Sequence, residues 1–182
     1  MIEQTHLKLP DPERDHLQGA IDAPIALLEY GDYECPVCGE AQPIVREIQL
    51  RLGDDLCFAF RHFPLTNVHQ HAEHAAEAAE AAGEQGAFWP MHEMLFANQD
   101  ALDDESLAEY AIALGLNEAR FIQDVVSGAN AERIREDFRS GVRAGVNGTP
   151  CFFINGQRYD GARALEPFLA AVAHSAISTR ND

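Results

Sequence analysis

The segment from residue 24 to residue 64 constrains the fold most, because it switches between strand and helix patterns. "PIALLEY" (24–30) is an apolar run with the length of a buried strand. From Cys38 onward apolar residues recur at helical spacing until Gly53, and "LCFAFRHFP" (56–64) alternates as a second strand that ends in proline. Strand, helix and strand over about forty residues predict a βαβ unit with parallel strands and a right-handed crossover.

The remaining chain has a helical middle and a β return. About twenty polar residues with two prolines precede the first strand and are predicted to be irregular. After the second strand the spacing is wholly helical, and "TPCFFINGQRYDG" (149–161) then places two apolar runs around the hairpin dipeptide "NG" before a last helix. The prediction is an α/β domain with an inserted helical domain, at residues 1–65 with 147–182 and at residues 66–146.

Composition and charge restrict the classes of function. The chain is 46% hydrophobic and 24% charged, which is typical of a folded globular protein. Thirteen Lys and Arg against thirty Asp and Glu give a net charge of -17, so we expect neither a nucleic-acid nor a membrane partner. No secretory signal is visible at the N-terminus, which predicts a cytoplasmic protein; a periplasmic or extracellular one would require a leader that has been removed.

A reducing compartment favours a catalytic or metal-binding role for the "CPVC" at residues 35–38 over a structural disulfide. Cys35 lies near the start of the predicted helix, where unpaired backbone N–H groups and the helix dipole stabilise a thiolate. Cys38 is one turn further along and can close a disulfide with Cys35. Cys35 is therefore the expected attacking thiol and Cys38 the resolving thiol.

A zinc site is the main alternative for these cysteines, since a CxxC pair can supply two of four ligands. Cys57 and Cys151 lie inside predicted strands, however, and lack the paired spacing of zinc ligands. The histidines of "HQHAEH" form another candidate set: His69, His71 and His74. We interpret them as surface or packing residues, and we predict no metal and no cofactor beyond the protein's own disulfide.

Four segments together resemble the DsbA-like thiol-disulfide oxidoreductases of the thioredoxin superfamily. They are "APIALLEYGDYECPVC", "FRHFPL" followed by His69, "QGAFWPMHEMLF" and "VNGTPCFFINGQRYDG". The resemblance extends from about residue 16 to the last helix. It implies an α/β, thioredoxin-like fold with a large all-helical insertion.

The resemblance also implies roles for residues other than the two cysteines. Thr149 and Pro150 would form a loop that faces the cysteines, with Pro150 cis and the Thr149 backbone turned towards substrate. Glu29 would be buried, with a raised pKa, and would exchange a proton with Cys38; the alternative is a solvated glutamate at a strand end. Pro36 and Val37, between the cysteines, are further substrate-binding candidates.

Several neighbouring side chains have simpler interpretations. Asp32 and Glu34 are expected to be exposed loop acids, whose charge would raise the pKa of Cys35. Cys57 and Cys151 are expected to be buried thiols. The aromatic residues of "FWPMHEMLF" (88–96) are expected to form a core of the inserted domain itself.

The expected function is dithiol-disulfide exchange with cysteine-containing proteins or peptides, with glutathione or a redox partner protein as further candidates. Val37 stands where the strongest oxidants of the family have histidine, so a strongly oxidising potential is not inferred. One alternative is a kappa-type glutathione transferase or isomerase, whose members generally have serine at the place of Cys35. The other is a non-catalytic zinc-binding or thiol-holding interaction module.

Overall fold

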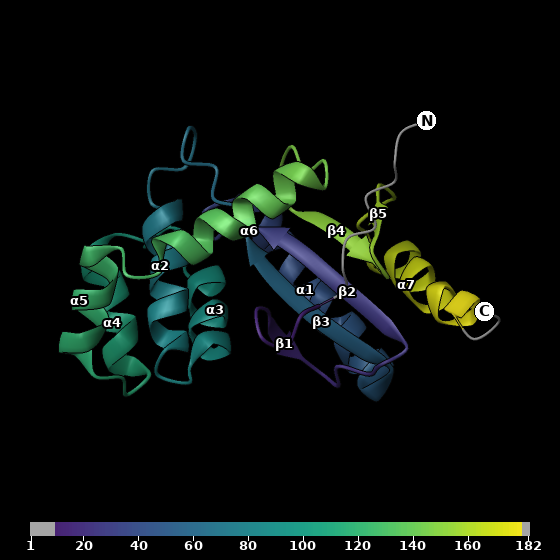
Figure 1. Cartoon of the computed structure of the whole chain (residues 1–182), viewed down its shortest axis with the longest axis horizontal. Coiled ribbons are helices and arrows are strands. Elements are labelled where there is room, and N and C mark those ends of the chain that lie inside the picture. The colour runs from purple at the N-terminus through teal and green to yellow at the C-terminus, as the bar shows by residue number, and fades with distance from the viewer. Residues whose placement is uncertain (1–9, 180–182) are drawn as a thin grey trace.

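The structure, a computed structural model, describes residues 10–179 and is built on one mixed sheet (Figure 1). The strands, in chain order, are β1 (His16–Gln18), β2 (Ile25–Gly31), β3 (Leu56–His62), β4 (Cys151–Ile154) and β5 (Gln157–Tyr159). Their order across the sheet is β1-β3-β2-β4-β5, with β2 and β3 parallel and the other neighbours antiparallel. Every residue of β2 and β3 is buried, as expected for central strands that are covered on both faces.

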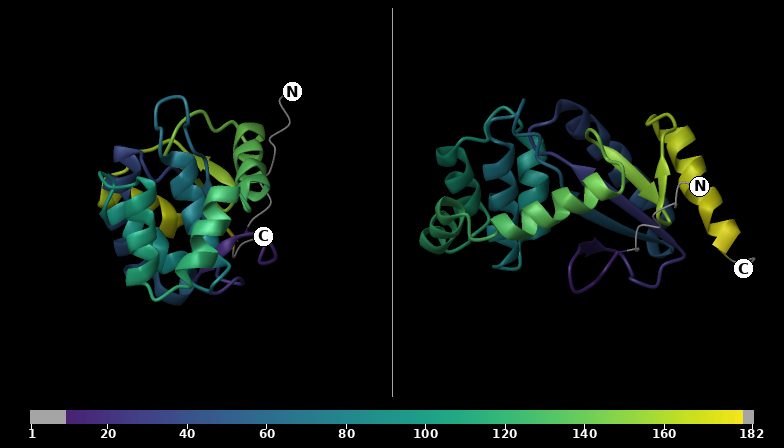
Figure 2. Two further views of the ribbon diagram at one scale, coloured as in Figure 1. Left: turned by 90° about the vertical axis from the view of Figure 1, so that its left-hand side faces the viewer. Right: turned by 45° about the horizontal axis from the view of Figure 1, so that its top comes forward.

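Seven α-helices lie within the described residues. They are α1 (Pro36–Leu52), α2 (Ala72–Gly83), α3 (Phe88–Ala97), α4 (Asp104–Ala113), α5 (Glu118–Ser127), α6 (Ala131–Arg143) and α7 (Leu165–Thr179). Helices α2 to α5 gather at one end of the sheet and α7 lies towards the other, so the molecule is elongated (Figures 1 and 2). The predicted thioredoxin-like architecture with an all-helical segment between β3 and β4 is confirmed.

The two faces of the sheet are covered by different helices, because alternate strand residues point to opposite sides. One face carries Leu27 and Phe58 and packs against α1, α3 and α7. The other carries Tyr30 and Phe153 and packs against α6 and the chain that follows it. Gly141 of α6 allows this contact, since a Cβ there would lie 2.8 Å from the Phe63 ring.

Local sequence signals account for several element boundaries. The Asn117 side chain accepts a hydrogen bond from the Arg120 N–H and caps α5, because asparagine is a favoured N-cap residue. Asn155 and Gly156 both have positive φ, 48° and 78°, which suits the tight turn between β4 and β5. The side chain of Asn155 also accepts from the Ala26 N–H at 2.8 Å and so ties this hairpin to β2.

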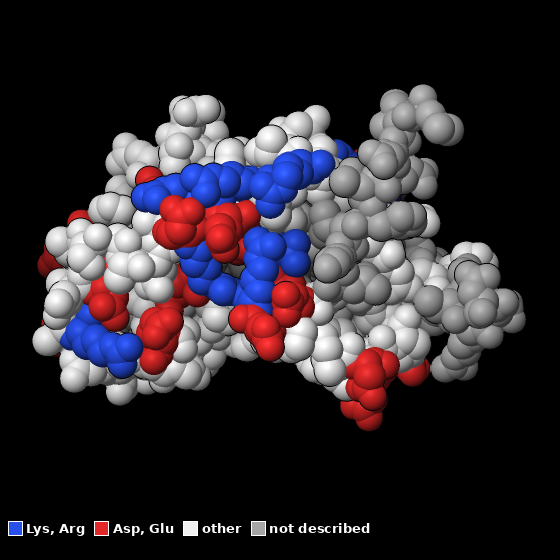
Figure 3. Space-filling view, in the orientation of Figure 1, with Lys and Arg blue, Asp and Glu red and all other residues white. Residues whose placement is uncertain are grey.

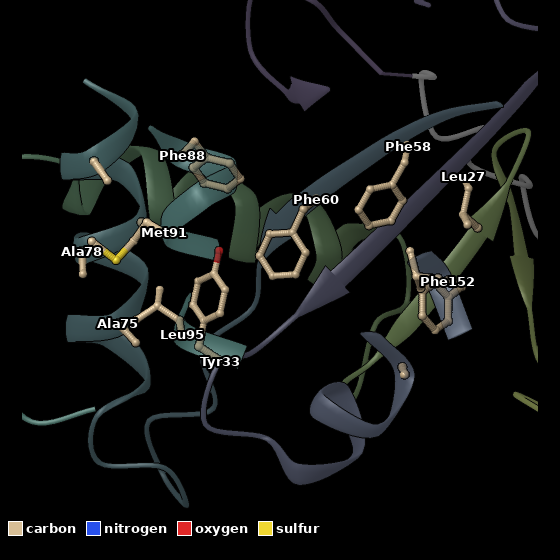
Figure 4. Close-up of a cluster of buried hydrophobic side chains, with 14 of the residues drawn as sticks. Leu27, Tyr33, Phe58, Phe60, Ala75, Ala78, Phe88, Met91, Leu95 and Phe152 are labelled. Carbon is tan, nitrogen blue, oxygen red and sulfur yellow. The ribbon is translucent and has the colours of Figure 1, made fainter. Parts of the chain in front are cut away.

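Two expectations, about the N-terminal lead-in and about the aromatic residues of α3, were wrong. The polar lead-in is not wholly irregular, because His16–Gln18 forms β1 and pairs with β3. The aromatic residues of α3 do not form a separate core either. Phe96 packs on Tyr33 and Phe60, with ring centroids 4.8 and 6.1 Å away. The helical segment and the sheet therefore share one core, which contains Leu95 of α3 together with Tyr33 and Phe60 (Figure 4).

Charge is distributed unevenly over this fold. Arginines follow α6 across the face shown in Figure 3, with acidic residues beside them. Some of these arginines form ion pairs, as Arg135 and Arg139 do with Glu132 and Arg133 does with Glu80. Within residues 10–179, no helix combines the length and the apolar character needed to cross a bilayer.

Candidate active site

Cys35 lies at the junction of β2 and α1, where it is the N-cap residue with an extended backbone. Its N–H donates to the Asp32 carbonyl at 3.1 Å, and its carbonyl accepts from the Gly39 N–H at 3.1 Å. The Cys35 side chain is largely buried, and Cys38 is fully buried one turn along the helix. Pro36 and Val37 between them are exposed, so the dipeptide forms the surface at this junction.

The surroundings of Cys35 stabilise its thiolate. A hydrogen bond from the Cys38 thiol is the largest cause that lowers the pKa of Cys35 from 9.0 to about 5, and the Thr149 side chain, followed by the Cys38 and Val37 backbone N–H groups, adds to it. Burial opposes this effect. Cys38 changes in the opposite direction, because burial, the hydrogen bond to Cys35 and the charge of Glu29 all raise its pKa. The pair therefore consists of one anionic and one protonated sulfur.

Glu29 is fully buried in β2, opposite Phe60 of β3 and Phe152 of β4. Burial raises its pKa from 4.5 to about 8, against a hydrogen bond from Gln42 that lowers it. The alternative of a solvated strand-end glutamate is therefore excluded. The carboxyl is coupled by charge to both Cys35 and Cys38, so its proton and theirs depend on each other.

Thr149 and Pro150 lie beside Cys35, although they are more than a hundred residues away in the sequence. The Thr149 carbonyl oxygen is 3.5 Å from Cys35 Sγ and accepts a hydrogen bond from the thiol form. The Thr149–Pro150 peptide bond is cis.

Asp32 is buried, so the expectation that it is an exposed loop acid was wrong. Its carboxylate accepts hydrogen bonds at 2.8 Å from the Glu34 N–H, the Leu65 N–H and His69 Nδ1. The donors from Leu65 and His69 belong to the loop after β3, which folds over the segment before Cys35. Glu34 is half-buried and accepts from the His71 N–H at 2.6 Å, so both acids fasten this loop to the redox junction.

The histidines considered as metal ligands have other partners. His69 contacts Asp32, and His74 Nδ1 lies 2.7 Å from Asp104. The His71 ring contacts Gln70. Across residues 10–179, no group of three or more His, Cys, Asp and Glu side chains is arranged to hold a metal ion.

Cys57 and Cys151 are buried as predicted. Burial raises the pKa of both thiols. Cys151 is the first residue of β4, pairs with Tyr30 of β2 and belongs to the core on the α6 side of the sheet.

Gln99 is a site residue that sequence reasoning missed. Its amide nitrogen donates to the carbonyls of Tyr33 and Cys35, at 2.8 Å each, and so holds the backbone around the reactive thiol. Gly39 is linked to it, since a Cβ at Gly39 would lie 2.0 Å from Gln99 Oε1. Gln99 is 64 residues from Cys35 in the sequence, and no local pattern marks it.

A family model described as thioredoxin matches residues 11–174, which is most of the chain and includes the whole of this site. The chain belongs to the thioredoxin family. The DsbA-like resemblance predicted from the sequence is confirmed.

Solved structures of similar proteins have the same fold. BdbD from Bacillus subtilis, in its oxidised form, has a TM-score of 0.82 at 20% identity, over 93% of this chain and 96% of its own. Wolbachia pipientis α-DsbA1 has a TM-score of 0.82 at 22% identity, over 98% of each chain. The catalytic domain of Proteus mirabilis ScsC has a TM-score of 0.79 at 19% identity, over 93% of each chain.

Curated relatives are more similar in sequence but much longer. A sodium/proton antiporter, NhaA 1 of Salinispora arenicola, is 46% identical over 170 residues, which are 93% of this chain and 26% of the relative. NhaA of Herminiimonas arsenicoxydans is 41% identical, with 27% of its length covered. This chain therefore spans about a quarter of the curated relatives that it matches.

Proposed function

We propose that this protein is a thiol-disulfide oxidoreductase that exchanges disulfides through Cys35 and Cys38. The observation that carries the proposal is the pairing of a stabilised Cys35 thiolate at the start of α1 with a buried, protonated Cys38 one turn away. An exposed Val37 and the adjacent Thr149–Pro150 loop give a substrate access to Cys35. This arrangement separates an attacking thiol from a resolving thiol.

In the reducing direction, the Cys35 thiolate attacks a substrate disulfide, forms a mixed disulfide and releases one substrate thiolate. Cys38 then loses its proton and attacks Cys35 Sγ, which forms the Cys35–Cys38 disulfide and releases the second substrate thiolate. The enzyme gives up two electrons and the substrate takes them. Oxidation of a substrate dithiol is the same sequence in reverse.

Glu29 is the proposed acceptor of the Cys38 proton. It is buried and its charge acts on Cys38, and its pKa near 8 allows it to take and return a proton at neutral pH. Thr149 and Pro150, with Pro36 and Val37, form the proposed substrate contact surface. An extended substrate peptide can pair with backbone here with little dependence on its sequence.

The proposed substrates are cysteine-containing proteins or peptides, and glutathione or a redox partner protein can serve as the second couple. The antiporter relatives favour a more specific candidate, thiol exchange with cysteines of a sodium/proton antiporter. A Cys38→Ser variant that traps an antiporter as a mixed disulfide would support it. If the variant traps only other proteins, the general proposal of thiol-disulfide exchange stands and the antiporter is excluded as a substrate.

Insulin reduction by thiol-supplied enzyme tests the general proposal. Cys35→Ser should abolish turnover, and Cys38→Ser should accumulate mixed disulfides that mass spectrometry places on Cys35. Cys151→Ser is a matched control, since it removes a buried thiol outside this pair and should retain turnover. Full turnover by Cys35→Ser would contradict the mechanism, and glutathione conjugation unaffected by loss of both cysteines would favour the kappa-type alternative.

A further inference from the structure

A chain of hydrogen bonds connects the buried Glu29 to helix α3. Gln42 of α1 places its amide nitrogen 3.4 and 3.5 Å from the two Glu29 carboxyl oxygens. The Gln42 carbonyl oxygen lies 3.2 Å from His92 Nε2, and His92 Nδ1 lies 3.1 Å from the Tyr33 hydroxyl. The chain therefore runs from β2 through α1 and α3 to the segment that precedes Cys35.

The chemistry of these groups determines which atoms donate. An ionised carboxylate only accepts, so Gln42 donates its NH₂ group to Glu29 and offers its oxygen to His92. His92 Nε2 then carries the ring proton, and Nδ1 accepts from Tyr33. Burial, followed by the charges of His62, His16 and Arg46, lowers the pKa of His92 to about 3, so the ring is neutral and has one proton to donate.

A cavity of about 330 Å³ between α1 and α3 reaches this chain. Gln42 and His92 line it, together with Arg46 and Glu93. Arg46 and Glu93 form an ion pair at 2.8 Å, and both are mostly exposed, so the cavity opens to solvent there. Neither Thr149 nor Pro150, the loop residues beside Cys35, lines this cavity.

We propose that Gln42 and His92 are positioning residues that hold the Glu29 carboxyl and set how readily it accepts the proton of Cys38. This inference rests on the proposed dithiol exchange. Glu29 is enclosed between Phe60 and Phe152 on the neighbouring strands, which offer it no polar partner. Gln42 is thus the side chain that stabilises its ionised form, and His92 orients the Gln42 amide.

The charged and titratable groups around this chain come from several elements. The charge of Cys35, the N-cap residue of α1, raises the pKa of Glu29. The charge of Glu29 in turn raises the pKa of Cys38 in α1 and of Tyr33 in the preceding loop. His92 faces Arg46 of α1, His62 of β3 and His16 of β1. Burial, with the charges of Glu80 and Glu29, raises the pKa of Tyr33, so its hydroxyl stays protonated and remains a donor.

Loss of Gln42 or His92 should slow the resolution step, in which Cys38 attacks the mixed disulfide at Cys35. Cys38 gives its proton to Glu29, its sulfur attacks Cys35 Sγ, and the thiolate bound to Cys35 leaves as the internal disulfide forms. Loss of the Gln42 donor raises the pKa of Glu29, because this hydrogen bond favours the ionised carboxyl. For each unit by which the pKa of Glu29 rises, its ionised fraction at pH 7 falls about tenfold. The rate of resolution falls by less than this, because the more basic carboxylate accepts the proton faster.

Stopped-flow reaction of the reduced protein with 5,5′-dithiobis(2-nitrobenzoate) separates the steps. Attack by Cys35 releases the first nitrothiobenzoate, and attack by Cys38 on the resulting mixed disulfide releases the second. Gln42→Met should slow only the second phase, by up to about tenfold at pH 7, and should raise the midpoint of its pH profile by about one unit. His92→Phe should act in the same direction, and His92→Gln should restore part of the rate, because glutamine keeps a donor for the Gln42 oxygen.

Gln49→Met is the matched control, because Gln49 lies in the same helix and cavity wall but bonds to Gln18 instead. It should leave both phases unchanged. Nuclear magnetic resonance titration of the ¹³C-labelled Glu29 carboxyl gives a readout independent of turnover, and its midpoint should rise in Gln42→Met. An unchanged Glu29 midpoint, or a second phase equal to that of the parent protein, overturns the inference. Absence of a second phase in the parent protein overturns the proposed function instead, while the Glu29 titration still decides the role of Gln42.

Discussion

The hydrogen bond from Cys38 to Cys35 makes a quantitative prediction about the thiolate. It is the largest cause that lowers the pKa of Cys35, which is about 5, whereas the ordinary value for a cysteine is 9.0. A hydrogen bond to a charged group contributes about 1.5 to 3 kcal/mol, which corresponds to about one to two pH units. Cys38→Ala should therefore move the titration midpoint of Cys35 upward by that amount. Cys38→Ser keeps an O–H donor and should stay within about half a unit of the parent protein.

The low pKa of Cys35 should change how its reaction rate depends on pH, and should change the rate at neutral pH only slightly. At pH 7 nearly all of Cys35 is ionised, against ~1% of a thiol with a pKa of 9.0, which is about 100-fold more nucleophile. A thiolate with a pKa near 5 is a weaker base than one with a pKa of 9.0, and it therefore reacts about 40- to 100-fold more slowly. The two effects nearly cancel at pH 7. At pH 5 the ionised fraction is about 5,000-fold higher than for the ordinary thiol, and a net gain of about 50- to 100-fold remains.

Iodoacetamide alkylation of reduced protein between pH 4 and pH 9, with peptide mass readout at Cys35, measures both quantities. The parent protein should show a midpoint near 5 and a nearly flat rate from pH 6 to 8. Absorbance of the thiolate at 240 nm gives the midpoint independently. A parent midpoint near 9, or a Cys38→Ala midpoint equal to that of the parent, would refute the assignment of Cys38 as the stabilising donor.

Three further predictions concern stability and the backbone around the site. Because the pKa of Cys35 is lowered, Cys35 contributes stability to the reduced fold that is fully present above pH 9.0 and is lost as the pH falls through 5. Because the pKa of Glu29 is raised, Glu29 contributes stability that is fully present below pH 4.5 and is lost as the pH rises through 8. In urea denaturation, stability should therefore rise with pH in Glu29→Gln and fall with pH in Cys35→Ser; equal slopes in the two variants would contradict both pKa directions. Gly39→Ala should lower the unfolding free energy by about 1 to 2 kcal/mol, because its Cβ displaces the Gln99 amide from two carbonyls, and an unchanged value would show that Gln99 is dispensable. Asp32→Ala should cost about 2 kcal/mol and increase hydrogen exchange at the Leu65 amide, while Asp32→Asn should cost less because it keeps an acceptor; protection retained in the alanine variant would argue against this contact.

The repeating patterns of the sequence were sufficient to predict the main elements. Strands β2 and β3 are buried along their whole length and are mostly apolar, and the "NG" turn has the positive φ values that such turns require. β1 was missed because three residues at the sheet edge carry no periodic pattern. Its contribution depends on pairing with β3, a contact made across about forty residues of sequence.

The candidate site was only partly predictable, for a similar reason. The positions of Cys35 and Cys38 follow from local structure, since a strand end and a helix start adjoin in the sequence. The burial of Asp32 depends on donors from the loop near Leu65, and the placement of Gln99 depends on α3 packing against α1. Such partners are set by tertiary packing and leave no local signal.

The central claim, that Cys35 and Cys38 form one two-electron redox couple, is tested most directly by equilibration against glutathione redox buffers. Acid quench, alkylation of free thiols and mass spectrometry of the peptide that contains residues 35–38 report the state of both cysteines. We predict one cooperative transition from two free thiols to a Cys35–Cys38 disulfide, with Cys57 and Cys151 remaining reduced throughout. Persistent glutathione adducts on Cys35 without an internal disulfide, or two thiols that stay free in oxidised buffer, would contradict the account.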